Sequence, residues 1–114
     1  MRRTKAIHHE PLSAAVLHVL LALSEGPQHG YAVMRRVEEE SGRVMGPGTV
    51  YGSLHRLCEL GWVKEAGPDA TDARRRSRYA LTARGRAVLK AEALRLTRLA
   101  SLARERGLVA QEGR

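Results

Sequence analysis

The chain has 114 residues, 43% of them hydrophobic and 4% aromatic, with one Cys and no Phe. This length fits a single domain with a helix-rich core of Leu, Val and Ala, and no apolar run is long enough to cross a membrane. The formal net charge is +8, and residues 74–106 alone hold 11 Lys or Arg against 2 Glu. A basic segment on an otherwise mildly acidic body is typical of proteins that bind nucleic acid.

The first third of the chain predicts two helices. The first begins near Ser13 and ends at Gly26-Pro27, and because it is apolar on more than one face we expect it to be buried from two directions. The second runs from about His29 to Ser41, and Gly42 ends it.

A third helix is predicted after the stretch Gly46-Pro47-Gly48, with Thr49 as its N-cap. Gly52 lies on its early turns, although Gly in a helix interior costs about 1 kcal/mol relative to Ala. Such a glycine indicates that something outside the fold requires a low, accessible surface there. The inward stripe of this helix consists of Val50, Leu54, Leu57 and Cys58.

Two short strands follow, at Trp62–Ala66 and Ser77–Leu81, where the pattern changes to alternation. The segment between them is too long for a tight hairpin turn, so we expect an extended loop. It is strongly basic, and we predict that its arginines contact the DNA backbone: Arg74, Arg75, Arg76 and Arg78.

The last predicted helix is capped by Thr82 and runs from about Ala83 to Arg106. Its apolar residues recur at alternating spacings of three and four, as in a coiled-coil seam, and the helix is longer than a body of this size can cover. We therefore expect dimerisation through one face, which contains Leu89, Ala93, Leu96, Leu99, Ala100 and Ala103.

This order of elements predicts a mainly α fold with a small two-stranded β wing: a winged helix-turn-helix with a long C-terminal dimerisation helix. Residues 1–82 would form the DNA-binding part, and residues 83–114 the dimerisation helix and tail, within one compact unit. The basic residues Arg2, Arg3 and Lys5 would form an N-terminal arm that touches the DNA backbone.

The third helix would be the recognition helix. Its outer face is small and polar, and a helix N-terminus suits a phosphate oxygen. We expect contacts with double-stranded DNA from Gly48, Thr49, Tyr51, Gly52, His55 and Arg56, and from His29 and Tyr31 at the start of the second helix. Tyr51 has the alternative of a half-buried residue that holds the helix in place.

The chain resembles the PadR family of transcriptional regulators over nearly its whole length. The matching pieces are His29-Gly30-Tyr31, Gly48-Thr49-Val50-Tyr51, Arg56-Leu57 with Glu59-Leu60-Gly61, Tyr79-Ala80-Leu81-Thr82 and Gly85-Arg86, together with Leu54. The resemblance implies a homodimeric repressor that binds a palindromic operator. The single helix after the wing is similar to the small-protein branch of the family.

Two residues depart from the family pattern. Gly52 stands where members often carry Pro or a larger residue, and Arg78 where many have a second Tyr, which makes this wing more basic. In several members a small molecule, often a phenolic acid or a planar drug, releases the repressor from DNA. The resemblance therefore leaves an effector open, and Trp62 is either a core residue or part of its pocket.

Other classes of function have weaker support. There is no G-x-S-x-G motif, no phosphate-binding glycine loop and no placed carboxylate pair, so we expect no enzyme and no cofactor. His8-His9-Glu10 is a poor metal cage, and Cys58 on a buried stripe indicates packing. The alternatives are a ligand- or metal-responsive winged helix of another family, or a winged-helix protein-interaction module. We expect a cytoplasmic protein, because the basic start is not followed by an apolar signal segment.

Overall fold

The structure, a computed structural model, describes residues 11–110. Four helices and three strands follow one another in the order α1 (Ala14–Leu23), β1 (Gln28–His29), α2 (Gly30–Ser41), α3 (Pro47–Glu59), β2 (Val63–Gly67), β3 (Arg78–Leu81) and α4 (Ala83–Glu105). The predicted winged-helix order is confirmed, with boundaries that shift by one or two residues. Within residues 11–110, no helix is long and apolar enough to span a bilayer.

Local side-chain chemistry explains most helix ends. The Ser13 hydroxyl accepts from the amide of Val16 (3.2 Å), and the Thr82 hydroxyl accepts from the amide of Gly85 (3.0 Å). Gly42 ends α2 with a φ of 76°, in the left-handed region that favours glycine. The prediction that Thr49 caps α3 is wrong. The helix begins at Pro47, whose fixed φ suits a first helical position, so Thr49 lies inside the first turn and Gly46 is the N-cap.

The wing sheet has three strands rather than the two expected. The strand order is β1-β3-β2, all antiparallel, with Gln28 opposite Tyr79 and His29 opposite Arg78. The Gln28 side-chain amide donates to the carbonyl of Ala22 at the end of α1, which fixes the connection to α2. His29 therefore belongs to a strand and to the N-cap of α2, not to the helix itself.

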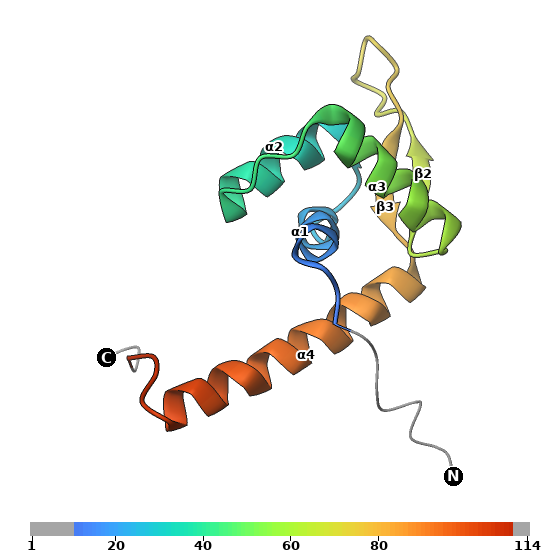
Figure 1. Cartoon of the computed structure of the whole chain (residues 1–114). Coiled ribbons are helices and arrows are strands. Elements are labelled where there is room, and N and C mark those ends of the chain that lie inside the picture. Colours follow the sequence, from blue (N-terminus) through green and yellow to red (C-terminus); the bar gives the residue numbers. More distant parts are fainter. Residues whose placement is uncertain (1–10, 111–114) are drawn as a thin grey trace.

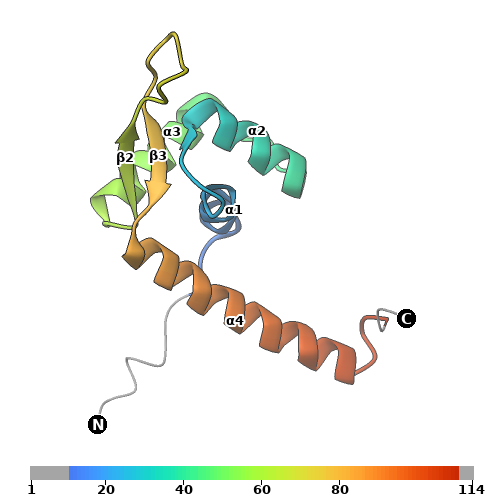
Figure 2. The same ribbon diagram turned by 180° about the vertical axis from the view of Figure 1, so that it is seen from behind.

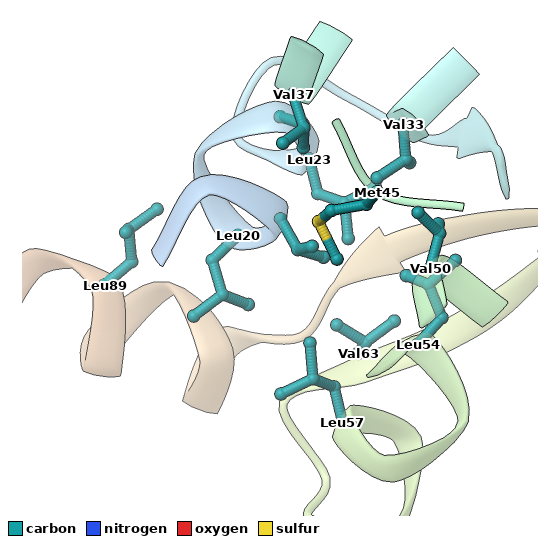
Figure 3. Close-up of a cluster of buried hydrophobic side chains, with 12 residues drawn as sticks. Leu20, Leu23, Val33, Val37, Met45, Val50, Leu54, Leu57, Val63 and Leu89 are labelled. Carbon is teal, nitrogen blue, oxygen red and sulfur yellow. The ribbon is translucent and has the colours of Figure 1, made fainter. Parts of the chain in front are cut away.

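The core forms around α1, which lies between α2 and α4 (Figures 1 and 2). Leu20 and Leu23 of α1 meet the apolar stripes of α2 and α3, with Val63 and Leu89 closing the cluster (Figure 3). The expected stripe of α3 is confirmed, since Val50, Leu54 and Leu57 are each at most 1% exposed and Cys58 is partly buried. Each fully buried Leu or Val contributes about 1.5–3 kcal/mol, more than a helix cap does.

The residues that follow α3 are hydrogen-bonded to the residue that caps α4. The amide of Thr82 donates to the carbonyl of Trp62 (3.0 Å), and its hydroxyl donates to the carbonyl of Gly61 (2.7 Å). Gly85 lies so close that a Cβ there would overlap the backbone of Trp62. The second half of α4 then extends away from the body of the protein (Figure 1).

Candidate nucleic-acid interface

The outer face of α3 is open and low. Gly48 and Gly52 have no positive φ, and a Cβ on either would meet nothing within 4 Å, so neither backbone geometry nor packing requires glycine. No side chain caps the first turn of this helix, which leaves its N-terminal end suited to an anion. The predicted contact residues on this face are all exposed: Gly48, Thr49, Tyr51, Gly52, His55 and Arg56.

Tyr51 has a packing role as well as an exposed surface. Its ring meets the Tyr79 ring edge-on, with centroids 6.4 Å apart, and a Cβ on Gly30 would overlap it. Tyr51 thus links α3 to the start of α2 and to β3, as the alternative interpretation proposed, yet 46% of it remains exposed. Burial raises the pKa of its partner Tyr79.

The two residues predicted at the start of α2 have different surroundings. Tyr31 is 53% exposed, and the guanidinium of Arg35 lies 6.0 Å from its ring centroid. His29 is mostly covered, and its Nε2 lies 3.6 Å from a carboxylate oxygen of Asp72. Tyr31 is therefore available to a partner molecule, whereas His29 turns towards the loop of the wing.

His55 and Glu59 form an exposed pair one turn apart on α3, with 3.4 Å between Nε2 and the nearer carboxylate oxygen. Surface pairs of this kind contribute at most about 1 kcal/mol, and this one is ionic only when His55 is protonated. The pairing is therefore weak enough to be replaced by a contact with DNA.

The four wing arginines are not equivalent. Arg76 donates from its side chain to Asp72 (3.1 and 3.2 Å), and Arg78 donates to the carbonyl of Gly67 (3.1 Å). Arg74 and Arg75 are exposed, and neither side chain has a partner among residues 11–110. The sequence analysis did not single out Asp72, although an Asp whose side chain binds amides a few residues further on is a turn signal.

On α4 the predicted dimer face is divided. Leu89 is 6% exposed because it packs in the core of its own chain. Leu96 and Leu99 are 37% and 48% exposed, and the small residues Ala93, Ala100 and Ala103 lie beside them. Leu102, which sequence reasoning left out, is 40% exposed and widens this apolar face.

Glu92, also missed, is buried in the middle of that face at 1% exposure. Arg95 binds it with two hydrogen bonds of 3.0 and 2.6 Å, and the amide of Leu12 donates to it at 3.3 Å. This hydrogen-bonded contact with Glu92 raises the pKa of Arg95. The acid therefore fastens α4 to the segment before α1.

Trp62 is partly buried, and the core interpretation is confirmed. It packs against the core, and it also lines a surface groove of about 340 Å³ with Val16, Leu57 and Leu60. Arg56 of α3 lies at the same groove. Residues 11–110 bring no three His, Cys, Asp or Glu side chains into a metal-binding group; His8-His9-Glu10 and the basic arm lie outside the described residues.

The basic loop and the start of α3 lie at one end of the molecule, and α4 lies at the other (Figure 1). An exposed helix flanked by a basic loop, with a long helix whose second half extends away from both, suits a protein that contacts an extended polyanion on one side and a second chain on the other.

Comparison with known proteins agrees with this architecture. A PadR family transcription regulator from Clostridium difficile R20291 shares the fold, with a TM-score of 0.71, 20% identity, and coverage of 82% of this chain and 97% of that one. Bacillus subtilis PadR, solved in complex with operator DNA, gives a TM-score of 0.61 at 22% identity, over 71% of this chain and 46% of that one.

A sequence relative and a family model extend the comparison. The 37.1 kDa protein in transposon TN4556 of Streptomyces fradiae is 39% identical over 85 residues, which make up 75% of this chain and 24% of that protein. The chain thus spans about a quarter of the length of that relative. The family model described as "Transcriptional regulator PadR-like family" matches residues 17–91. The chain belongs to the PadR-like family of transcriptional regulators.

Proposed function

We propose that this protein binds a palindromic DNA operator as a homodimer and represses transcription. In this proposal α3 enters the major groove, and the loop between β2 and β3 contacts the adjacent backbone. The observation that carries it is the face of α3, where Gly48 and Gly52 have open space that the fold does not need, next to a basic loop. The fold shared with Bacillus subtilis PadR, which was solved in complex with operator DNA, supports DNA binding by this fold.

Dimerisation is the second part of the proposal. The 23 residues of α4 give a helix about 34 Å long, and among residues 11–110 its second half is mostly exposed. The leucines at 96, 99 and 102 would pack against the same face of a second copy, as in an isologous two-fold interface. Residues 11–82 would then form the DNA-binding part and residues 83–110 the dimerisation helix and the described part of the tail.

Release by a small molecule is the third part. The groove beside Trp62 includes Arg56, so an occupant there would compete with the contact of Arg56 with DNA. Because the chain has a single Trp, its fluorescence reports occupancy of this groove directly. A phenolic acid and a planar cationic dye are suitable probes, and binding of either should lower operator affinity in the same titration.

Fluorescence anisotropy tests DNA binding. Labelled duplex from directly upstream of the gene is compared with an unrelated duplex of equal length, each at two salt concentrations. Binding about 10³-fold tighter to the upstream duplex, together with reduced transcription from that promoter in vitro, is the expected result. Equal, steeply salt-dependent binding to both would contradict specific recognition.

A winged-helix protein-interaction module is the remaining alternative. Such a module needs no exposed arginines on the wing, and Arg74 and Arg75 are both exposed without side-chain partners in the described part of the chain. Absence of binding to either duplex at low salt would favour this alternative over the proposed one.

A further inference from the structure

Asp72 organises the tip of the wing loop. Its carboxylate accepts hydrogen bonds from the backbone amides of Arg74 (3.1 Å) and Arg76 (2.9 Å), and from Nε (3.1 Å) and one terminal nitrogen (3.2 Å) of the Arg76 side chain. Only 7% of the Asp72 side chain is exposed. The Arg76 guanidinium, and with it the two backbone amides, holds the pKa of Asp72 well below its usual range.

Arg75 lies between the two amides that Asp72 binds. Its φ is 55°, the only positive φ at a non-glycine residue in the described chain. A residue with a Cβ is disfavoured in this conformation, so it persists only where its surroundings impose it. The carboxylate of Asp72 binds the residues on either side, and its carbonyl accepts from the amide of Arg75 (3.0 Å). Together these bonds supply that constraint and fix the direction in which the Arg75 side chain leaves the loop.

Asp72 also connects the loop to the rest of the DNA-facing surface. Its Oδ2, which also accepts from the amide and Nε of Arg76, lies 3.6 Å from Nε2 of His29, the N-cap residue of α2. The next residue, Gly30, is the one on which the ring of Tyr51 from α3 rests. The carboxylate of Asp72 is therefore connected to the recognition helix through two consecutive residues, His29, which it contacts, and Gly30, on which Tyr51 packs.

We infer that Asp72 is a positioning residue for DNA recognition. It directs Arg74 and Arg75 towards DNA phosphates, and Arg76 serves as its internal partner instead of contacting DNA. This inference rests on the proposed function and divides the wing arginines into two that bind DNA and two that hold the wing, Arg76 and Arg78.

Three effects of removing Asp72 can be separated, because each changes the affinity for operator DNA and the affinity for unrelated DNA in a different way. Loss of the fold would weaken binding to operator and to unrelated DNA alike. Loss of a negative charge alone would strengthen both, since it raises the attraction to phosphates. Loss of positioning would weaken operator binding while binding to unrelated DNA stays equal or rises.

The test measures both affinities for the full-length chain carrying Asp72→Ala. We expect the ratio of specific to non-specific affinity to fall about tenfold, which corresponds to about 1.4 kcal/mol. Asp69→Ala is the matched control, because it removes the same charge from the same loop but, within residues 11–110, its carboxylate accepts hydrogen bonds from Thr71 alone. That control should leave the ratio unchanged. Asp72→Asn should restore part of it, since an amide oxygen can still accept from the backbone.

Single arginine variants complete the experiment. Arg74→Ala and Arg75→Ala should each make the negative slope of log affinity against log salt shallower by about 0.9, the value for one phosphate contact. Arg76→Ala should leave the slope unchanged and lower the affinity ratio as Asp72→Ala does. In the Asp72→Ala background, Arg74→Ala should have a smaller effect than in the wild type.

Each result decides between explanations. Identical effects of Asp72→Ala and Asp69→Ala, or a shallower salt slope for Arg76→Ala, would overturn the positioning role while leaving the proposed function in place. Equal binding of the wild type to both duplexes would overturn the proposed function and this inference with it. Should Asp72→Ala fail to fold, Asp72→Asn and Arg76→Ala carry the same comparison.

Discussion

Gly52→Ala should make the protein more stable and a poorer DNA binder. Gly52 lies inside α3 with ordinary helical geometry, and an added Cβ would meet nothing within 4 Å. The free protein therefore gains helix propensity without any clash. Against DNA the same methyl group occupies the space into which we propose a phosphate or base edge fits.

The expected gain in the free energy of unfolding is about 0.5–1 kcal/mol, the usual difference between Gly and Ala within a helix. For a domain of this size, 1 kcal/mol raises the melting temperature by roughly 4–8 °C. The operator affinity should fall at least about tenfold, or about 1.4 kcal/mol, because the helix can no longer approach as closely. Stability and binding thus change in opposite directions.

Thermal unfolding followed by circular dichroism gives the first quantity, and fluorescence anisotropy with operator and unrelated duplex gives the second. Ser101→Ala is a suitable control, since Ser101 is exposed on α4, far from α3, and Ala is the better helix former. That variant should be slightly more stable and bind DNA as the wild type does.

Two results would refute the reasoning. If Gly52→Ala binds the operator as tightly as the wild type, this face of α3 does not approach DNA closely. If the variant melts at a lower temperature, the space around Gly52 is not open, and the glycine serves the fold after all.

Three further changes test other parts of the molecule. Gly85→Ala should lower the free energy of unfolding by about 1–3 kcal/mol in urea titrations, because its Cβ would overlap the rigid backbone of Trp62; unchanged stability would contradict the close contact. Leu99→Arg should convert the proposed dimer to a monomer in analytical ultracentrifugation with helix content kept, and a surviving dimer would exclude this face. Tyr51→Phe should largely retain the melting temperature while Tyr51→Ala lowers it, since ring carbons supply most of the packing on Gly30 and Tyr79; equal melting of the two variants would refute that packing role.

Much of the fold could be predicted because repeating patterns report burial directly. The spacing of Val50, Leu54 and Leu57 placed the inner side of α3 correctly, and each of these side chains is buried. Strand β1 could not be predicted in this way, because a two-residue strand shows no period and forms only by pairing with distant β3. The N-cap of α3 was misplaced since Thr49 has the better capping side chain, whereas Pro47 starts the helix earlier.

The interface was predictable in composition but not in detail. Exposed polar residues on α3 and a basic loop are visible in the sequence. Which arginines are held internally depends on contacts that form only when the loop folds, as between Asp72 and Arg76. The contact of the Tyr51 side chain with Gly30 joins residues far apart in the chain, and no local pattern encodes such a contact.

The hydrogen bonds between the end of α3 and the start of α4 fix the orientation of the recognition helix relative to the proposed dimer helix. Since Thr82 is tied to Gly61 and Trp62, and Gly85 leaves no room for slippage, α3 and α4 turn together about one point. Over the length of α4, about 34 Å, a rotation of about 5° displaces the far end by roughly 3 Å, close to the 3.4 Å rise of one base pair. The angle at this junction would then set the number of base pairs between operator half-sites, so relatives that read the same bases could still differ in the spacing they accept.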